Sequence, residues 1–446
     1  MGVFTGNKVK MVKNSDSNGP QIIALVTASI ISFSAGSLYA YASPAIPKLL
    51  TDYNFTIQDT AYFPIIPAVA MLVSTPIGCK LADKIGRKRT LLIAGMLHIL
   101  SWLLIALART SYVIYISRIF FGIADAGMMA ALPAYIAEVS TPKVRSLYGN
   151  IMVISSFIGQ FVANCIGYYL SISVAGFAMM PIPILFVIAF SFMPETPYYL
   201  IMSGTSAEAM NSLQKLRGYE NVKAEFIQIS LDVHRQLSES GRFKDLFLIK
   251  SNRKALIIAV ISRCFQTFSG SNCIAVYSQY IFQEVGGNIS NGVAGMIVSG
   301  LFAVVNPFAN IICDKLAFNI VNLSVISWFP VVGLATYSVT FCLGLGVVPT
   351  LFLGEIFSTN IRRYGSAVTN VVVSANFCVA LQLFPLLSGY GMWVPFLVFG
   401  LCCLIASVGS WFIIPETKGK TLEEIQQMLK GTVVKGNQTT KSENVL

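Results

Sequence analysis

Two acid–base pairs with identical spacing are the residues of this sequence best suited to switchable chemistry. Glu138 and Arg145 lie seven positions apart, and Glu355 and Arg362 repeat that interval. Each acid follows a long apolar run. Opposite charges at a partly buried interface attract by several kcal/mol at most, which suits a contact that forms in one state and breaks in another. Exposed ion pairs within single loops, worth about 0–1 kcal/mol, are the alternative.

A second repeated feature is the tripeptide Pro-Glu-Thr, which occupies residues 194–196 and again 415–417. The interval between the two copies of the tripeptide is nearly the same as the interval between the two acid–base pairs. The sequence therefore indicates two copies of one unit. Duplicated halves that rock about a central site are typical of secondary transporters.

Both copies consist largely of uncharged apolar segments. Charged residues make up 11% of the chain, whereas soluble domains contain about 25%. Four runs carry no charged residue, namely 146–194, 285–313, 316–354 and 364–415. Each exceeds the roughly 20 residues that a helix needs to cross hydrocarbon. The composition therefore predicts an all-α membrane protein.

The hydropathy pattern divides the chain into two membrane bundles separated by a polar segment of helical character. Spans are expected at 21–43, 61–79, 90–108, 112–137, 148–170, 173–193, 255–283, 291–313, 366–388 and 391–414. The predicted domains are a cytoplasmic tail (1–20), an N-terminal bundle (21–200), a cytoplasmic helical linker (201–254), a C-terminal bundle (255–415) and a second cytoplasmic tail (416–446).

The interval 316–354 is too short for its place in the second bundle. It lies between Lys315 and Glu355, which we expect on the same, cytoplasmic side, so it must cross the membrane twice. Two spans need about 40 residues before any connecting loop. The sequence predicts that the second bundle is short by most of its third helix, either through a real loss or through an error in the gene model.

Basic residues are concentrated in alternate loops. One dense group runs from Lys215 to Lys254, whereas the loops 171–175 and 284–292 have none. This positive-inside bias predicts that both termini are cytoplasmic, and it accounts for the net charge of +11 without nucleic acid. The sequons at Asn54 and Asn288 would then be external glycosylation sites. We expect a multi-pass protein of the plasma membrane, with the lipid bilayer as its main surroundings.

Metal, cofactor and enzyme chemistry are not expected. The two histidines, His98 and His234, are far apart in the sequence. The nine cysteines show no paired spacing typical of a zinc site or a disulfide framework. The predicted spans hold no convergent set of His, Cys or paired carboxylates, and no nucleotide-binding loop occurs.

The loop that runs from Gly78 through Asp83 to Gly86-Arg87-Lys88 resembles the loop signature of the major facilitator superfamily. Further motifs resemble its sugar porter family and, within that family, the insect branch of facilitated trehalose transporters. These motifs are Arg118-x-x-x-Gly122, Pro133-x-Tyr135-x-x-Glu138, residues 194–200, residues 415–421, Ser43-Pro44 and Ser327-Trp328-Phe-Pro330. The resemblance implies two pseudo-symmetric six-helix bundles that move a small sugar, trehalose or a hexose, by alternating access.

The resemblance also assigns roles to the charged loop residues. In this family, cytoplasmic acids and bases form an inner gate that closes across the two halves. The corresponding residues here are Asp83, Arg87, Glu138, Arg145, Glu195, Glu355, Arg362 and Glu416.

Three amides in apolar spans match positions where the family contacts sugar. Gln266 and Asn272 lie in a segment similar to the family's Gln-Gln-Leu-Ser-Gly-Ile-Asn, and Asn376 resembles the asparagine of its Asn-Trp pair. Amides in hydrocarbon need partners, which sugar hydroxyls can supply. Hydrogen bonds between helices are the alternative. The chain departs from the family's amides and tryptophans at Val153, Thr267, Thr350 and Phe377.

Two charged residues stand inside predicted spans where the family is normally uncharged, Asp125 and Arg263. They pair with each other or bind a charged or zwitterionic solute, unless Arg263 extends toward the cytoplasm. The span 21–43 has no acid that could carry a coupling proton, which favours facilitated diffusion. Asp125 leaves proton coupling open, and the departures from the family leave a non-transporting sensor or decayed paralogue open. Neither the solute nor the oligomeric state follows from the sequence.

Overall fold

The computed structural model describes residues 18–52, 55–219, 221–238, 243–285, 291–313, 336–338, 341 and 362–413. All regular elements within these ranges are helices. Eight helical segments among them are long and apolar enough to cross a membrane. The predicted all-helical membrane fold is therefore confirmed, whereas the shortened interval 316–354 lies largely outside the described residues.

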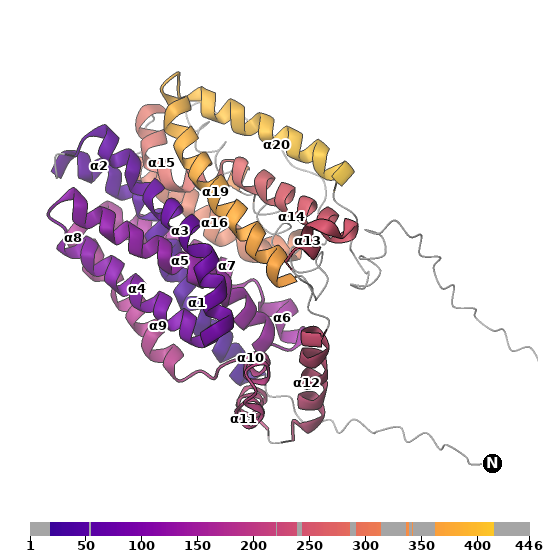
Figure 1. Cartoon of the computed structure of the whole chain (residues 1–446). Coiled ribbons are helices and arrows are strands. Elements are labelled where there is room, and N and C mark those ends of the chain that lie inside the picture. The colour runs from indigo at the N-terminus through magenta and orange to yellow at the C-terminus, as the bar shows by residue number, and fades with distance from the viewer. Residues whose placement is uncertain are drawn as a thin grey trace, which may run out of the picture.

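The first half of the chain forms one bundle, coloured indigo to magenta in Figure 1. Its helices are α1 (Gly19–Ala40), α2 (Ala42–Asp52), α3 (Ile57–Ile85), α4 (Arg87–Leu107), α5 (Ser111–Val139), α6 (Pro142–Tyr148), α7 (Ile151–Tyr169), α8 (Ile172–Met179) and α9 (Pro181–Ser191). The sixth predicted span is thus two helices, because the chain is interrupted at Met180, directly before a proline that cannot donate a backbone hydrogen bond.

The second half contributes α14 (Lys250–Phe268), α15 (Ser271–Val285), α16 (Asn291–Cys313), α19 (Arg362–Ser388) and α20 (Trp393–Ile413). Of these, α19 and α20 belong to the eight segments that are long and apolar enough to cross a membrane. Between the halves come α10 (Pro197–Met202), α11 (Ser206–Arg217), α12 (Lys223–Ser238) and α13 (Asp245–Leu248). Figure 1 shows α10, α11 and α12 grouped at one end of the molecule, away from α2 and α8. We call this the α11 end and the other the α2 end; the positive-inside pattern predicts that the α11 end is cytoplasmic.

Local sequence signals fix the two ends of α3. At its start, Thr56 and Asp59 form a capping box in which each side chain accepts a hydrogen bond from the other residue's backbone N–H, at 3.2 and 3.0 Å. Hydrogen bonds from Thr56 lower the pKa of Asp59 below its ordinary value. At its end, Gly86 adopts φ +100°, and a Cβ there would lie 2.2 Å from the Glu195 carboxylate. Glycine therefore permits both the turn and the close carboxylate.

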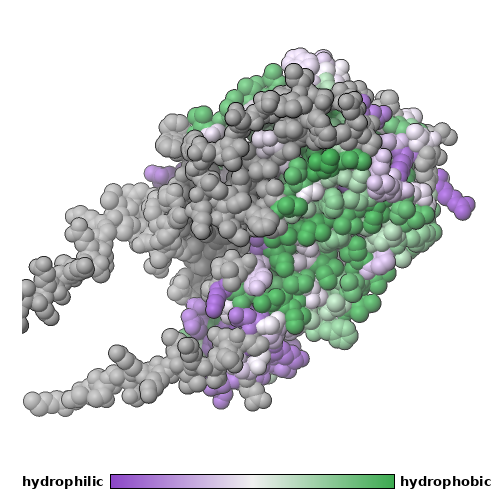
Figure 2. Space-filling model, turned by 180° about the vertical axis from the view of Figure 1, so that it is seen from behind, coloured by the Kyte–Doolittle hydropathy of each residue, from purple (hydrophilic) through white to green (hydrophobic). Residues whose placement is uncertain are grey.

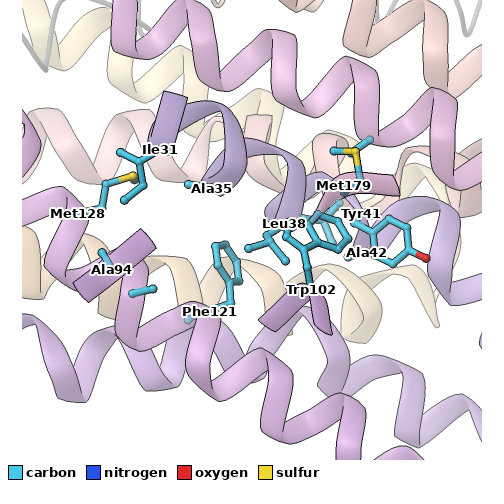
Figure 3. Close-up of a cluster of buried hydrophobic side chains, with 14 of the residues drawn as sticks. Ile31, Ala35, Leu38, Tyr41, Ala42, Ala94, Trp102, Phe121, Met128 and Met179 are labelled. Atoms are coloured by element: carbon cyan, nitrogen blue, oxygen red, sulfur yellow. The ribbon is translucent and has the colours of Figure 1, made fainter. Parts of the chain in front are cut away.

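Aromatic and aliphatic side chains fill the core of the first bundle. Figure 3 shows Trp102 of α4 beside Tyr41, with the rings edge to face at 5.3 Å between centroids. Ile31 and Leu38 of α1 and Phe121 of α5 are also buried in this core. Such packing holds α1 against α4 and α5, so the polar residues on these helices occupy fixed positions.

The outer surface matches a bilayer. Figure 2 shows a broad hydrophobic face bordered by hydrophilic residues. Large aromatic side chains are exposed near the α2 end, including Tyr112, Tyr169, Tyr390 and Trp393. Aromatic residues at this position are typical of the membrane–water interface.

The two halves pack through symmetrically placed helices, α3 against α19 and α7 against α16. The hydroxyls of Thr75 and Ser374 lie 3.4 Å apart at the first contact. At the second contact, the rings of Phe157 and Phe302 stack with centroids 5.4 Å apart. These contacts surround the region in which the sequence predicts a solute site.

Candidate functional site

The helix that carries two of the predicted solute-binding amides is broken. The sequence predicts one continuous span over 255–283, but α14 ends at Phe268 and α15 begins at Ser271. Gly270 at the break has φ +93°, and a Cβ there would approach the Phe399 ring to 2.7 Å. Interrupted helices are tolerated within a membrane where they are buried in protein or line a cavity, and many transporters place substrate sites at such breaks.

Hydrogen bonds at the break replace part of the helical ladder. The Ser269 hydroxyl donates to the Gln266 carbonyl at 2.8 Å. The Ser269 carbonyl in turn accepts from the Tyr337 hydroxyl at 3.1 Å. Gln266 therefore lies in the last turn of α14, and Asn272 lies in the first turn of α15, on either side of the interruption.

Gln266 is held by a charged neighbour one turn away. Arg263 Nη1 donates to its amide oxygen at 2.6 Å. Both side chains are partly buried. A hydrogen bond from a guanidinium is stronger than one between neutral groups, so Arg263 fixes the orientation of the Gln266 amide.

Asn272 and Asn376 are connected to the same region through Tyr39 and Cys264. The Tyr39 hydroxyl of α1 donates to the Asn272 backbone carbonyl at 3.3 Å. Asn376 of α19 donates to the thiol of Cys264, two residues before Gln266, at 3.0 Å. Phe377 packs edge to face against Tyr39 with centroids 6.0 Å apart. The structure thus places Asn272, through its backbone carbonyl, against α1, and Asn376 against the last turns of α14, the part of that helix that also carries Gln266.

Asp125 and Arg263 do not form the ion pair that the sequence suggests. The ion pairs within 4.0 Å among the described residues do not include one between them. Arg263 contacts Gln266 on its own helix instead. Asp125 lies halfway along α5, partly buried, and close enough to Tyr39 to interact with it electrostatically. Sequence alone could not decide this, because the pairing depends on how the two bundles are rotated.

Two further amides, Gln160 and Asn164 of α7, were missed by the sequence reasoning. They line a small cavity between the halves, of about 10 Å³, together with Ser278, Ser299 and Phe302. Asn164 is 1% exposed, and its amide oxygen has no hydrogen-bond partner within the described part of the chain. The signal was present in the sequence: the two amides lie four residues apart, on one helix face, within an uncharged run.

A direct polar contact joins the halves near the α2 end. The hydroxyls of Ser43, the first residue of the Ser-Pro motif, and Ser278 lie 2.9 Å apart. The Gln279 backbone N–H also donates to Ser43 Oγ at 3.2 Å. These bonds hold α2 against α15 and so join the two halves at this end.

Four of the eight predicted gate residues, Asp83, Arg87, Glu138 and Glu195, lie together at the α11 end. Glu138 Oε1 lies 3.0 Å from Arg87 Nη2, and Glu138 Oε2 accepts from the Thr196 hydroxyl at 2.6 Å. Arg87 also lies 3.8 Å from Asp83. The Arg87 and Glu138 side chains are only 9% and 17% exposed, so the pair is more strongly coupled than a surface ion pair.

Glu195, the fourth of these residues, caps α4. Both of its carboxylate oxygens accept from the Lys88 backbone N–H at 3.1 Å, and one accepts from the Thr196 N–H at 2.9 Å. Carboxylates at helix N-termini are stabilised by the helix dipole. Burial nevertheless raises the pKa of Glu195, while the backbone hydrogen bonds oppose that rise.

The described contacts of the gate residues stay within the first half. The Arg145 guanidinium, which is exposed, donates to the carbonyls of Ala137 and Ser140 rather than to an acid. Arg362 begins α19, but its side chain is not among those described, and Glu355 and Glu416 lie outside the described residues. The sequon residues Asn54 and Asn288 also lie outside the described residues. A gate across the two halves therefore stays a prediction.

Comparison with known proteins identifies the family. The family model described as "Sugar (and other) transporter" matches residues 22–317 and 308–429, and the chain therefore belongs to this family. The two matched segments overlap at residues 308–317, next to the interval that the sequence predicts to be shortened.

Curated relatives agree with this assignment. The chain is 29% identical, over an alignment of 448 positions, to the facilitated trehalose transporter Tret1 of Polypedilum vanderplanki, and the alignment covers 93% of this chain and 88% of the relative. It is 30% identical, over an alignment of 453 positions, to the Tret1-2 homolog of Drosophila sechellia, with 93% of this chain and 91% of the relative covered. These relatives are transporters and not enzymes, as the sequence predicts.

A solved structure supports the fold. The proton:xylose symporter XylE of the major facilitator superfamily, bound to 6-bromo-6-deoxy-D-glucose, superposes with a TM-score of 0.73 at 18% identity, covering 92% of this chain and 99% of the symporter. The predicted major facilitator fold is therefore confirmed.

Proposed function

We propose that the chain moves a small neutral sugar, trehalose or a hexose, down its gradient by alternating access. The observation that carries this proposal is that Gln266 and Asn272 flank the break between α14 and α15, which contact α1 through Asn272 and α19 through Asn376. Amide groups can donate to and accept from sugar hydroxyls. The relatives' names as trehalose transporters support the choice of solute.

The arrangement of contacts between the halves supports alternating access. The bonds of Ser43 to Ser278 and Gln279 join the halves at the α2 end. At the α11 end, the ion pairs of Arg87 remain inside one half. Among the described residues, this asymmetry suits a state that opens toward the α11 end, and we propose that this side is the cytoplasm of a plasma-membrane protein.

Uptake of labelled sugar by oocytes that express the full chain tests the proposal. Labelled trehalose and glucose should enter faster than in water-injected cells, with saturation and without an inward proton current. The absence of uptake of either sugar at normal surface abundance would favour a non-transporting sensor.

Proton-coupled transport is the second candidate, and Asp125 is the observation that favours it. This carboxyl lies mid-membrane and makes no ion pair or side-chain hydrogen bond within the described part of the chain. An ionisable group in that position is expensive unless it serves a function. The uptake experiment separates the two candidates when it is repeated between pH 5.5 and 8. A proton current that Asp125→Asn abolishes would establish coupling, whereas uptake without current supports facilitated diffusion.

A further inference from the structure

The start of α14 presents a stripe of positive charge that the proposed transport cycle does not use. Lys250, Arg253 and Lys254 are exposed, and so is Ile257 on the following turn. The spacing i, i+3, i+4 and i+7 places all four on one face of the helix. A cationic surface therefore leads directly into the apolar face of a membrane helix.

These cations have no acidic partner among the described residues. Lys250, Arg253 and Lys254, together with the exposed Lys244 just before α13, make no ion pair or side-chain hydrogen bond within the described part of the chain. Arg87 and Arg217 at the same end of the molecule behave differently. They pair with Glu138 and Glu225 at 3.0 and 2.7 Å. Among the described residues, the stripe therefore has no acid that competes with a negatively charged group from outside the protein.

Exposed apolar side chains surround the stripe. Leu248 is 75% exposed and Ile257 is 49% exposed, and Phe247 and Ile249, on either side of Leu248, are exposed as well. The segment is not loose, because Leu246 is fully buried and the Phe243 ring packs edge to face on Tyr364 of α19, with centroids 5.6 Å apart. Figure 1 shows α13 beside the start of α14 and apart from α11.

Depth along α14 matches the layers of a bilayer leaflet. A helix rises 1.5 Å per residue, so Ile257 lies roughly 10 Å beyond Lys250. The headgroup layer on each side of the hydrocarbon is roughly 5–8 Å thick. When Ile257 contacts acyl chains, Arg253 and Lys254 therefore lie in the headgroup layer and Lys250 lies at its outer border.

We propose that the surface formed by Lys244, Lys250, Arg253 and Lys254 with Leu248 and Ile257 binds the headgroup of an anionic phospholipid. The cations match the phosphate and carboxylate charges, and the apolar residues contact the upper part of the acyl chains. A lipid held there would anchor the first turn of the helix whose last turn carries Gln266. The inference does not depend on which solute is transported.

Native mass spectrometry of the purified full-length protein in neutral detergent tests the site, with phosphatidylserine and phosphatidylcholine as probes. Wild-type protein should bind phosphatidylserine in preference to phosphatidylcholine. Because each cation near an anionic surface contributes about a fivefold change in affinity, Lys250→Gln with Lys254→Gln should weaken phosphatidylserine binding roughly twentyfold or more. The variant with Lys250→Arg and Lys254→Arg, which keeps both positive charges, should bind phosphatidylserine like the wild type. The matched control, Lys215→Gln with Lys223→Gln, removes two exposed cations from α11 and α12 and should leave binding unchanged.

Two results would overturn the proposal. Equal weakening in the test and control pairs would mean that only net charge matters. Equal competition by glycerophosphoserine, which has the headgroup without chains, would mean that the surface binds a soluble anion. Thermal melting in phosphatidylcholine micelles verifies that the variants fold. If the glutamine pair does not fold, Leu248→Ser alone should weaken lipid binding, and unchanged binding in that variant would equally contradict the proposal.

Discussion

Replacing Asn376 or Gln266 by alanine is the sharpest probe of the proposed solute site. A hydrogen bond to a neutral partner contributes about 0.5–1.5 kcal/mol net. Since about 1.4 kcal/mol corresponds to a factor of ten, loss of one bond to the sugar should raise the apparent KM about two- to tenfold. The maximal rate per transporter at the surface should change less, because the amides act in binding.

The structure predicts that the two variants differ in stability. In the protein, Asn376 donates to the Cys264 thiol, a weak acceptor, so Asn376→Ala should leave surface abundance nearly normal. Gln266 accepts from Arg263 at 2.6 Å, and a bond to a charged group is worth about 1.5–3 kcal/mol. Gln266→Ala should therefore lower abundance as well, whereas Gln266→Glu retains an acceptor for the guanidinium.

Initial uptake rates over a range of sugar concentrations, normalised by surface biotinylation, measure both effects. Gln21→Ala is the matched control, because the Gln21 amide is buried and accepts from the Thr141 backbone N–H at 3.0 Å, near the α11 end. It should change abundance without changing KM. Wild-type KM values in both Asn376→Ala and Gln266→Ala would refute the reasoning and leave these amides with a structural role.

Three other predictions follow from the inter-bundle and α11-end contacts. Ser43→Cys with Ser278→Cys should allow a short bifunctional thiol reagent to block uptake reversibly; undiminished uptake after verified cross-linking would contradict movement of the halves at the α2 end. Arg87→Ala leaves the Glu138 carboxylate buried without its cation, so it should cost about 3–5 kcal/mol, seen as a lower melting temperature that Arg87→Lys partly restores. Glu195 has a raised pKa from burial, so it favours the folded state most at low pH, and this contribution is lost as pH rises from 4.5 through the raised pKa. Glu195→Gln should therefore match or exceed wild-type melting temperature at pH 7.5 and flatten its pH dependence, whereas an equally steep profile in the variant would contradict this.

Helix positions were largely predictable from the sequence because hydropathy shows where each apolar segment begins and ends. The expected span 291–313 coincides with α16 (Asn291–Cys313), and the expected span 112–137 lies within α5 (Ser111–Val139). Hydropathy does not report interruptions, since a broken helix is as apolar as a continuous one. At the break, Gly270 packs against the ring of Phe399, which lies far away in the sequence.

The site was predictable only in part, for a similar reason. Gln266, Asn272 and Asn376 could be found by type and motif, but the partners that orient them, Arg263 and Tyr39, come from the way the helices pack. The absence of an Asp125–Arg263 contact within the described part of the chain depends on the relative rotation of the halves. A single sequence does not specify that rotation, because a transporter adopts more than one.

Counterflow in proteoliposomes tests the central claim most directly. Purified protein is reconstituted into vesicles preloaded with unlabelled trehalose or glucose, which are then diluted into a trace of the labelled sugar with no proton gradient. An alternating-access carrier exchanges one sugar molecule for another, so the account predicts a transient accumulation of label above its equilibrium level. The overshoot should persist when a protonophore is added. Vesicles that show no overshoot with either sugar, despite correctly folded protein, would contradict the account.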